Sequence, residues 1–211
     1  ASHQATMIRA RGVPVDNVTP FDTDRLQRRK LALLAEQDRE FAARVSDPNP
    51  IESAIANYET AFRMQSTIPD VTDISGEPAH IRELYGVDSK DEHQRLYATQ
   101  ALRARRLVES GVRFVEITCP SFDGNNSPWD QHGLLKKNHE KNARVTDQSV
   151  AALIVDLEQR GLLDETIVLW AGEMGRTPHT PKISATCGRD HHVNAYSIFM
   201  AGGGFKGGAT Y

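Results

Sequence analysis

The sequence is short of the features that mark several large classes of protein. It has only two cysteines, Cys119 and Cys187, in 211 residues, which is too few for a scaffold held by several disulfides. Its 25 lysines and arginines are outnumbered by 28 acidic residues, and this net charge of −3 argues against nucleic acid as the main partner. It has no apolar run near the roughly 20 residues that cross a bilayer, and its first residues form no signal peptide.

The overall composition is typical of a globular protein. Hydrophobic residues make up 39% and charged residues 25%, which supplies enough apolar side chains for one domain or two. The two cysteines could form a disulfide, bind a metal or stay as buried thiols, and their scarcity favours buried thiols.

The first part of the chain is predicted to be helical. Asp22-Thr23-Asp24 offers N-cap candidates for an amphipathic helix that ends near Val45, and a second helix follows from about Ile51. Pro69 and the residues around it predict a loop over 66–78.

Two more helices follow this loop. A short helix is predicted over 78–85, and a long one over 89–110 should end at Gly111, as expected of a left-handed position. The long helix should turn Leu96, Leu102 and Leu107 inward and carry three of its arginines on the other face. These are Arg103, Arg105 and Arg106.

After residue 111 the periodicity changes to that of strands alternating with a helix. Residues 112–117 alternate strictly and predict a strand, and a helix is expected over 138–160. Residues 166–171 are almost wholly apolar, as in a central strand covered on both faces, and 195–201 suggest a third strand. This order predicts an α/β sheet flanked by helices, with 1–88 as a mostly helical segment packing on a core of residues 89–211.

Three polar clusters follow or border the apolar segments of this core. In open α/β sheets, ligands bind beyond the carboxyl ends of the strands, so side chains placed there are candidates for a functional site. The clusters are Trp129-Asp130-Gln131-His132-Gly133, Gly172-Glu173-Met174-Gly175-Arg176 and Gly188-Arg189-Asp190-His191-His192.

Each cluster also has an explanation without a ligand. Asp130 and His132, two residues apart in an extended loop, project to the same side and could grip one cation or only make turn hydrogen bonds. Glu173 could bind a cation or form a salt bridge with Arg176, which could equally clamp a substrate oxyanion. His191 and His192 point opposite ways, so only one of them faces the site. Imidazoles and carboxylates together suit zinc or another first-row metal better than calcium or magnesium.

Several blocks of residues resemble the DUF1501 family. They occur in the family's order and with similar gaps over residues 90–211. The blocks are 103–115, 129–133, 161–166, 173–178, 188–191 and 202–204, with Met174 in place of a more frequent phenylalanine.

The resemblance implies an exported bacterial protein with an α/β core like that of the alkaline phosphatase and sulfatase superfamily. It implies a metal site and favours His191 over His192. The implied ligands are Asp130, His132, Glu173, Asp190 and His191, and the implied cofactor is a divalent metal, zinc first, with manganese or calcium as alternatives.

We therefore expect a metal-dependent hydrolase of phosphate or sulfate esters, with Arg176 stabilising developing charge. The expected partner is a small-molecule or polysaccharide ester, with no nucleic acid and no membrane span. The alternative is a non-catalytic exported protein that keeps the fold and binds a partner or polysaccharide. Superfamily members carry their nucleophile and a further metal-binding aspartate in an N-terminal region, which we expect upstream of residue 1. The family also continues beyond residue 211, so the chain reads as an internal piece of a longer protein.

Overall fold

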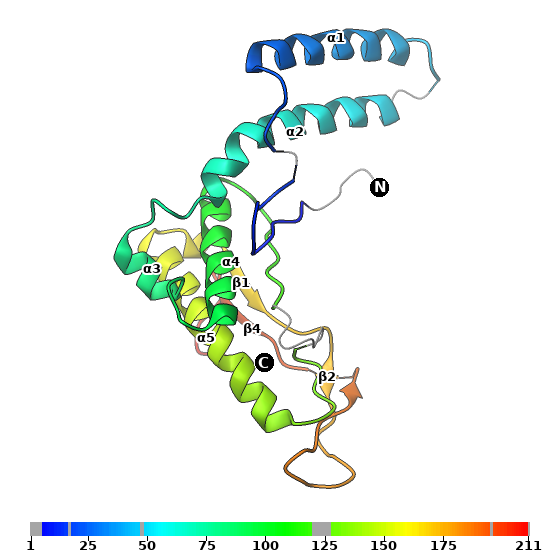
Figure 1. Cartoon of the computed structure of the whole chain (residues 1–211). Coiled ribbons are helices and arrows are strands. Elements are labelled where there is room, and N and C mark those ends of the chain that lie inside the picture. The colour runs from blue at the N-terminus through cyan, green and yellow to red at the C-terminus, as the bar shows by residue number, and fades with distance from the viewer. Residues whose placement is uncertain (1–5, 17, 47–48, 120–127, 195, 211) are drawn as a thin grey trace. The chain divides into compact units, whose positions relative to one another are not determined.

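The computed structural model describes residues 6–16, 18–46, 49–119, 128–194 and 196–210. These residues form two compact units, 1–73 and 74–211 (Figure 1). Within the described ranges, no helix has both the length and the apolar character needed to cross a membrane.

The first unit is built on two antiparallel helices, α1 (Asp24–Ala42) and α2 (Asn49–Thr72). Thr23 is the N-cap of α1, and its hydroxyl accepts a hydrogen bond from the backbone of Leu26, as the sequence predicted. Gln27 of α1 donates to Gln65 of α2 at 2.6 Å, and the guanidinium of Arg28 lies 4.9 Å from the ring of Phe62.

The loop predicted over 66–78 was wrong in its first half. Helix α2 continues through Pro69 to Thr72, and it bends in its second half (Figure 1). A proline removes only one hydrogen bond of the helical ladder, and half-buried apolar residues continue at helical spacing through Ile68 and Val71. The Thr72 hydroxyl also donates to the Ile68 carbonyl at 2.7 Å, so the last turn remains held.

In the described part of the second unit, three α-helices pack around a main apolar core. They are α3 (Ala79–Tyr85), α4 (Glu92–Glu109) and α5 (Leu135–Gln159). Its buried centre combines Tyr85 and Leu102 with small residues, Ala98, Ala101 and Ala152, that let the helices approach closely. Gly86, Gly111 and Gly161 each follow a helix with positive φ, which confirms the predicted stop at Gly111.

Helices α4 and α5 run parallel to each other. Gln94 donates to Gln148, Arg105 pairs with Asp156 and Arg160 pairs with Glu109, so contacts advance along both helices in the same direction. Residues 110–134 separate the two helices in the sequence. The predicted strand over 112–117 was wrong, because these residues are extended but pair with no described strand, and Phe114 is 82% exposed.

Two small antiparallel sheets complete the second unit. Strand β1 (Ile167–Trp170) pairs with β4 (Phe199–Gly202), and β2 (Gly175–Arg176) pairs with β3 (His191–His192). The strands predicted at 166–171 and 195–201 are thus present in part. The expected cover on both faces of 166–171 was wrong, because Ile167, Leu169 and Trp170 are exposed in a two-stranded sheet. The fold is α/β in the general sense, with helices and small antiparallel sheets.

The prediction that Arg105 lies on the outer face of α4 was wrong. Its side chain is 2% exposed and lies 2.7 Å from Glu77, 2.7 Å from Glu109 and 3.0 Å from Asp156. The position shares its helical face with the apolar residues Ala98 and Leu102, so it points into the core, where only paired charges are tolerated. Tyr85 completes the cluster by donating its hydroxyl to Asp156 at 3.1 Å.

Replacing Arg105 should therefore destabilise the second unit strongly. Arg105→Ala should lower the free energy of unfolding by about 3–5 kcal/mol, because it leaves buried carboxylates without their cation. Arg144→Ala, at an exposed position of α5, is the matched control and should change it by less than about 0.5 kcal/mol. Urea unfolding followed by circular dichroism measures both, and equal losses would contradict the role given to Arg105.

Glu77 should make this stability depend on pH. Burial alone would raise the pKa of Glu77, but hydrogen bonds from Arg106 and Arg105 outweigh it and lower the pKa. A carboxyl whose pKa is lowered by folding contributes stability above its unfolded-state pKa, and this is lost as pH falls through the folded pKa. Glu77→Gln should flatten the loss of unfolding free energy between about pH 5 and pH 3, whereas Glu83→Gln, on the exposed side of α3, should not.

Candidate metal centre

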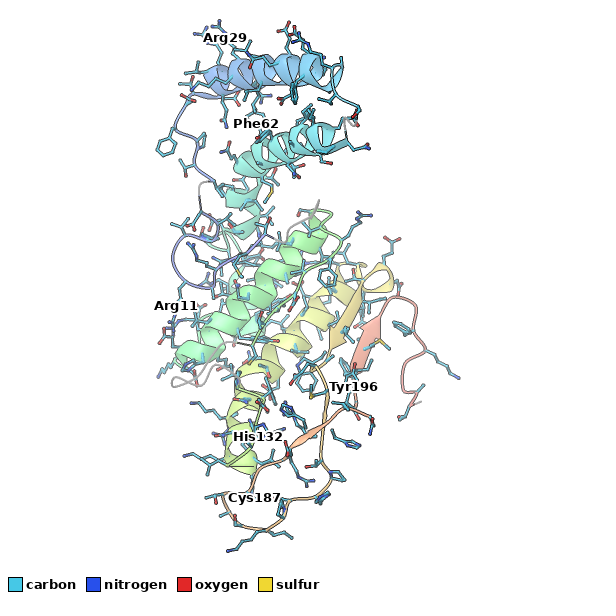
Figure 2. All side chains as sticks on the ribbon, turned by 90° about the vertical axis from the view of Figure 1, so that its right-hand side faces the viewer. Arg11, Arg29, Phe62, His132, Cys187 and Tyr196 are labelled. Atoms are coloured by element: carbon cyan, nitrogen blue, oxygen red, sulfur yellow. The ribbon has the colours of Figure 1, made fainter. Side chains whose placement is uncertain are left out.

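The first of the three polar clusters is held between β1 and α5. The ring of Trp129 packs edge-on against Trp170 of β1, with centroids 5.7 Å apart, and against His139 of α5 at 5.4 Å. The loop that carries Asp130 and His132 therefore starts at a fixed point beside the end of a strand. Figure 2 shows His132 and Cys187 on neighbouring loops of this unit.

Side chains alternate along this loop. Gln131 is buried, donates to the carbonyl of Pro128 at 2.9 Å and contacts His139 through its side-chain oxygen. Asp130 and His132 on either side of it project the other way and contact each other. The prediction that Asp130 and His132 project to the same side of the loop is thus confirmed. The buried Gln131 between them holds the loop in place.

The third cluster lies directly against the first. Leu134 and Leu135 donate backbone hydrogen bonds to the carbonyls of Thr186 and Cys187, both at 3.0 Å, and Arg189 donates to Gln131 at 3.0 Å. Gly188 sits at the closest approach, where an added Cβ would lie 2.0 Å from the carbonyl carbon of His132. Only glycine allows these two backbones to come so near.

The second cluster joins the third through the β2–β3 ladder. Arg176 lies opposite His191 in this register, so the chain folds back between them. Thr177 donates to the Asp190 carbonyl at 2.8 Å, and Arg189 donates to the Thr177 carbonyl at 2.7 Å. Three segments distant in sequence are thus tied together by backbone hydrogen bonds.

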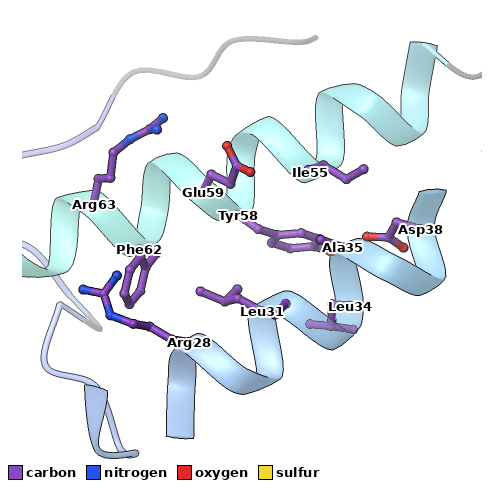
Figure 3. A pocket seen from close by; sticks show the side chains of 11 residues that line it. Arg28, Leu31, Leu34, Ala35, Asp38, Ile55, Tyr58, Glu59, Phe62 and Arg63 are labelled. Atoms are coloured by element: carbon purple, nitrogen blue, oxygen red, sulfur yellow. The ribbon is translucent and has the colours of Figure 1, made fainter. Parts of the chain in front are cut away.

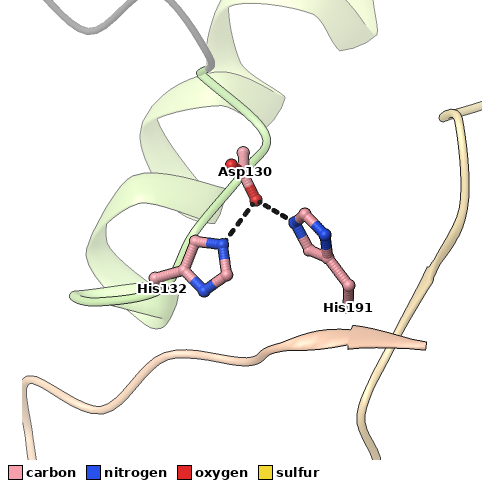
Figure 4. A group of neighbouring side chains, drawn as sticks. All are labelled: Asp130, His132 and His191. Carbon is pink, nitrogen blue, oxygen red and sulfur yellow. Dashed lines mark hydrogen bonds and ion pairs between the residues drawn. The ribbon is translucent and has the colours of Figure 1, made fainter.

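The three segments converge on one carboxylate oxygen. Oδ1 of Asp130 lies 3.0 Å from Nε2 of His132 and 3.0 Å from Nε2 of His191 (Figure 4). It also lies 2.5 Å from a guanidinium nitrogen of Arg176. The ligand atoms of Asp130, His132 and His191 all lie within 4.8 Å of one another.

Two of the predicted ligands lie at the edge of this group. Glu173, 63% exposed, reaches it through Arg176, whose second nitrogen donates to the glutamate at 3.1 Å. Asp190 lies 3.7 Å from the other ring nitrogen of His132. His192, although it is the next residue in β3, contributes no ligand atom to the described cluster.

The electrostatics keep Asp130 ionised. The hydrogen bond from His191 lowers the pKa of Asp130 below its ordinary value; burial opposes this, and Arg176 adds to the lowering. The ionised Asp130 oxygen is thus surrounded by nitrogens of His132, His191 and Arg176. The guanidinium of Arg176 is the cation that this oxygen binds here.

The donor types of the three side chains, and the two distances from Asp130, suit a first-row metal. Neighbouring ligand atoms around a tetrahedral zinc with bonds of about 2.0–2.1 Å lie about 3.3 Å apart, close to the 3.0 Å between Asp130 and each imidazole.

Sequence reasoning missed the residues that support this group. Gln131 and Asn142, both buried, hold the first loop by donating to the same Pro128 carbonyl. The signal for Gln131 was its place between two polar residues of an alternating loop. Gly188 also had a signal, because a glycine beside a polar cluster often marks a close backbone approach.

The structure therefore presents a candidate metal centre of one carboxylate and two imidazoles, carried on loops of an α/β unit. The chain belongs to the DUF1501 family, described as a family of proteins of unknown function, whose model matches residues 1–211. No curated protein and no solved structure matches the chain.

Gly188 offers a direct test of how the three segments are held. Gly188→Ala should lower the free energy of unfolding by about 1–3 kcal/mol, because the methyl group overlaps the His132 backbone. Gly207→Ala, where an added Cβ meets nothing within 4 Å, is the matched control. Thermal unfolding measures both variants, and equal stability of the Gly188 variant and the wild type would contradict the close approach.

Proposed function

We propose that this protein is an exported, metal-dependent hydrolase of phosphate or sulfate esters. The observation that supports it is the convergence of Asp130, His132 and His191, with ligand atoms within 4.8 Å, beside the guanidinium of Arg176. An anion-binding side chain next to a set of metal ligands is the combination that the hydrolysis of charged esters requires.

The side chains have distinct proposed roles. Asp130, His132 and His191 hold a divalent metal, zinc first, with manganese or calcium as alternatives, and this metal polarises an ester oxygen when bound. Glu173 and Asp190 are proposed as further ligands, since each already contacts a member of the group.

Arg176 is the proposed catalytic residue. Its two terminal nitrogens point to Asp130 and Glu173, so a bidentate donor is already placed beside the ligands. Once the carboxylates bind metal, the guanidinium is available to hold two non-bridging oxygens of a phosphate or sulfate ester.

The finer assignments rest on the sequence resemblance alone. They are an alkaline phosphatase-like core, an exported location and an ester of a small molecule or polysaccharide as substrate. The division into a helical segment over 1–88 and a core over 89–211 stays a prediction.

Removing single ligands should separate this proposal from an unspecific acidic surface. His191→Ala and Asp130→Asn should weaken zinc binding by at least about 10–100-fold, since even outer-shell changes have effects of this size. His192→Ala, one residue along β3, is the matched control and should retain affinity. Titration calorimetry with zinc measures binding, and turnover of aryl phosphate and aryl sulfate esters, compared between wild type and Arg176→Lys, measures activity. No zinc binding by the wild type, or equal losses at His191 and His192, would contradict the proposal.

A second function, from a different class, is a non-catalytic protein in which the same group serves as a structural staple. The observation that favours it is that Asp130 is already satisfied by Arg176 and two histidines, which together tie all three segments. In that case zinc should raise the unfolding temperature while neither ester is hydrolysed.

A further inference from the structure

The helical hairpin of the first unit leaves much of its apolar surface open. No side chain of α1, all of whose residues are described, is buried, and Leu33 and Phe41 are each 58% exposed. A groove of about 430 Å³ lies between α1 and α2 (Figure 3). Its apolar lining includes Leu31, Leu34, Ile55, Tyr58 and Phe62. Two helices alone are rarely stable in water without a further apolar partner.

Charge is distributed unevenly along this hairpin. Residues 24–31 of α1 carry four basic side chains and one acidic one, whereas 32–42 carry three acidic and one basic. In α2, residues 49–59 carry two acidic side chains, and 60–72 carry one of each sign. Because the helices are antiparallel, the start of α1 lies beside the end of α2, which gives the hairpin one basic end and one acidic end.

The groove shows the same polarity. Arg28 and Arg63 line it at the basic end, beside Phe62, and Asp38 and Glu59 line it on the side of Ile55 (Figure 3). A surface with an apolar centre and opposite charges at its two ends is complementary to itself when a copy is turned by 180°.

We propose that the groove between α1 and α2 binds the same hairpin of a second copy of this chain. The two hairpins form a four-helix bundle around a two-fold axis, in which each basic end meets the acidic end of the other chain. The apolar groove residues then form the centre of the bundle, as in known antiparallel helix bundles. Electrostatic complementarity fixes the antiparallel orientation.

Charge reversal tests the proposal on the whole chain. The wild type should sediment at twice the 23.4 kDa of one chain. A variant with Arg28→Glu and Arg63→Glu has acidic side chains at both ends of the groove, and a variant with Asp38→Lys and Glu59→Lys has basic side chains at both ends of the groove. Each alone should dissociate at least about tenfold more readily, because like charges then meet. An equimolar mixture of the two should form heterodimers, and the variant with all four changes should dimerise again.

A control variant and a crosslinking experiment on the wild type test the same dimer even if a charge-reversed variant loses helix. Lys136→Glu with Lys137→Glu, at exposed positions of α5, should leave the association unchanged. Lys30 is the only lysine in residues 1–73, so carbodiimide coupling of mixed isotope-labelled and unlabelled wild-type chains should join Lys30 of one chain to a glutamate of 36–59 in the other. A monomeric wild type, an association indifferent to charge reversal, or the absence of label-mixed crosslinks would overturn the proposal.

Discussion

The second unit depends on burying one positive charge in the middle of its helices. Arg105 is enclosed by carboxylates from Glu77, just before α3, from Glu109 at the end of α4, and from Asp156 in α5. A buried guanidinium tolerates few displacements of its partners, because each lost contact leaves an uncompensated charge in a low-dielectric interior. The network therefore fixes how far α5 is shifted along α4. This shift in turn sets where the chain leaves α5 at Gly161 and enters β1.

The candidate metal centre depends on the position of β1, which the Arg105 network helps to set. Trp170 at the end of β1 contacts Trp129, and Trp129 precedes Asp130. The 28 residues between β1 and β4, 171–198, contain both Arg176 and His191. Both of these side chains contact the carboxylate of Asp130. Regular secondary structure contributes little here, since β2 and β3 have two residues each. The loops are ordered instead by backbone hydrogen bonds and by the contact at Gly188.

The sequence predicted the parts of the fold that local periodicity determines. Helix ends at Thr23, Gly86, Gly111 and Gly161 follow from capping chemistry, which acts over a few residues. The grouping of Asp130 and His132 follows from the alternation of an extended loop, and the preference for His191 over His192 came from the family resemblance. Periodicity could not say whether 112–117 has a neighbouring strand, because strand pairing depends on distant residues. It also misplaced Arg105, since a charged residue on an apolar face is read as exposed until its carboxylate partners are known.

The ion pair of Asp130 with Arg176 and the proposed metal site share one requirement, a positive charge beside the Asp130 carboxylate. Arg176 now supplies the positive charge that keeps Asp130 ionised, and a divalent cation bound by Asp130, His132 and His191 would supply it instead. In the proposed hydrolase, a metal would compete with the guanidinium for Oδ1 of Asp130 and, by binding, would free Arg176 to meet an anion. Binding of metal and of an anionic ester would then be linked, because each favours the state in which Arg176 has left Asp130. An ion pair that binds no metal has no such linkage.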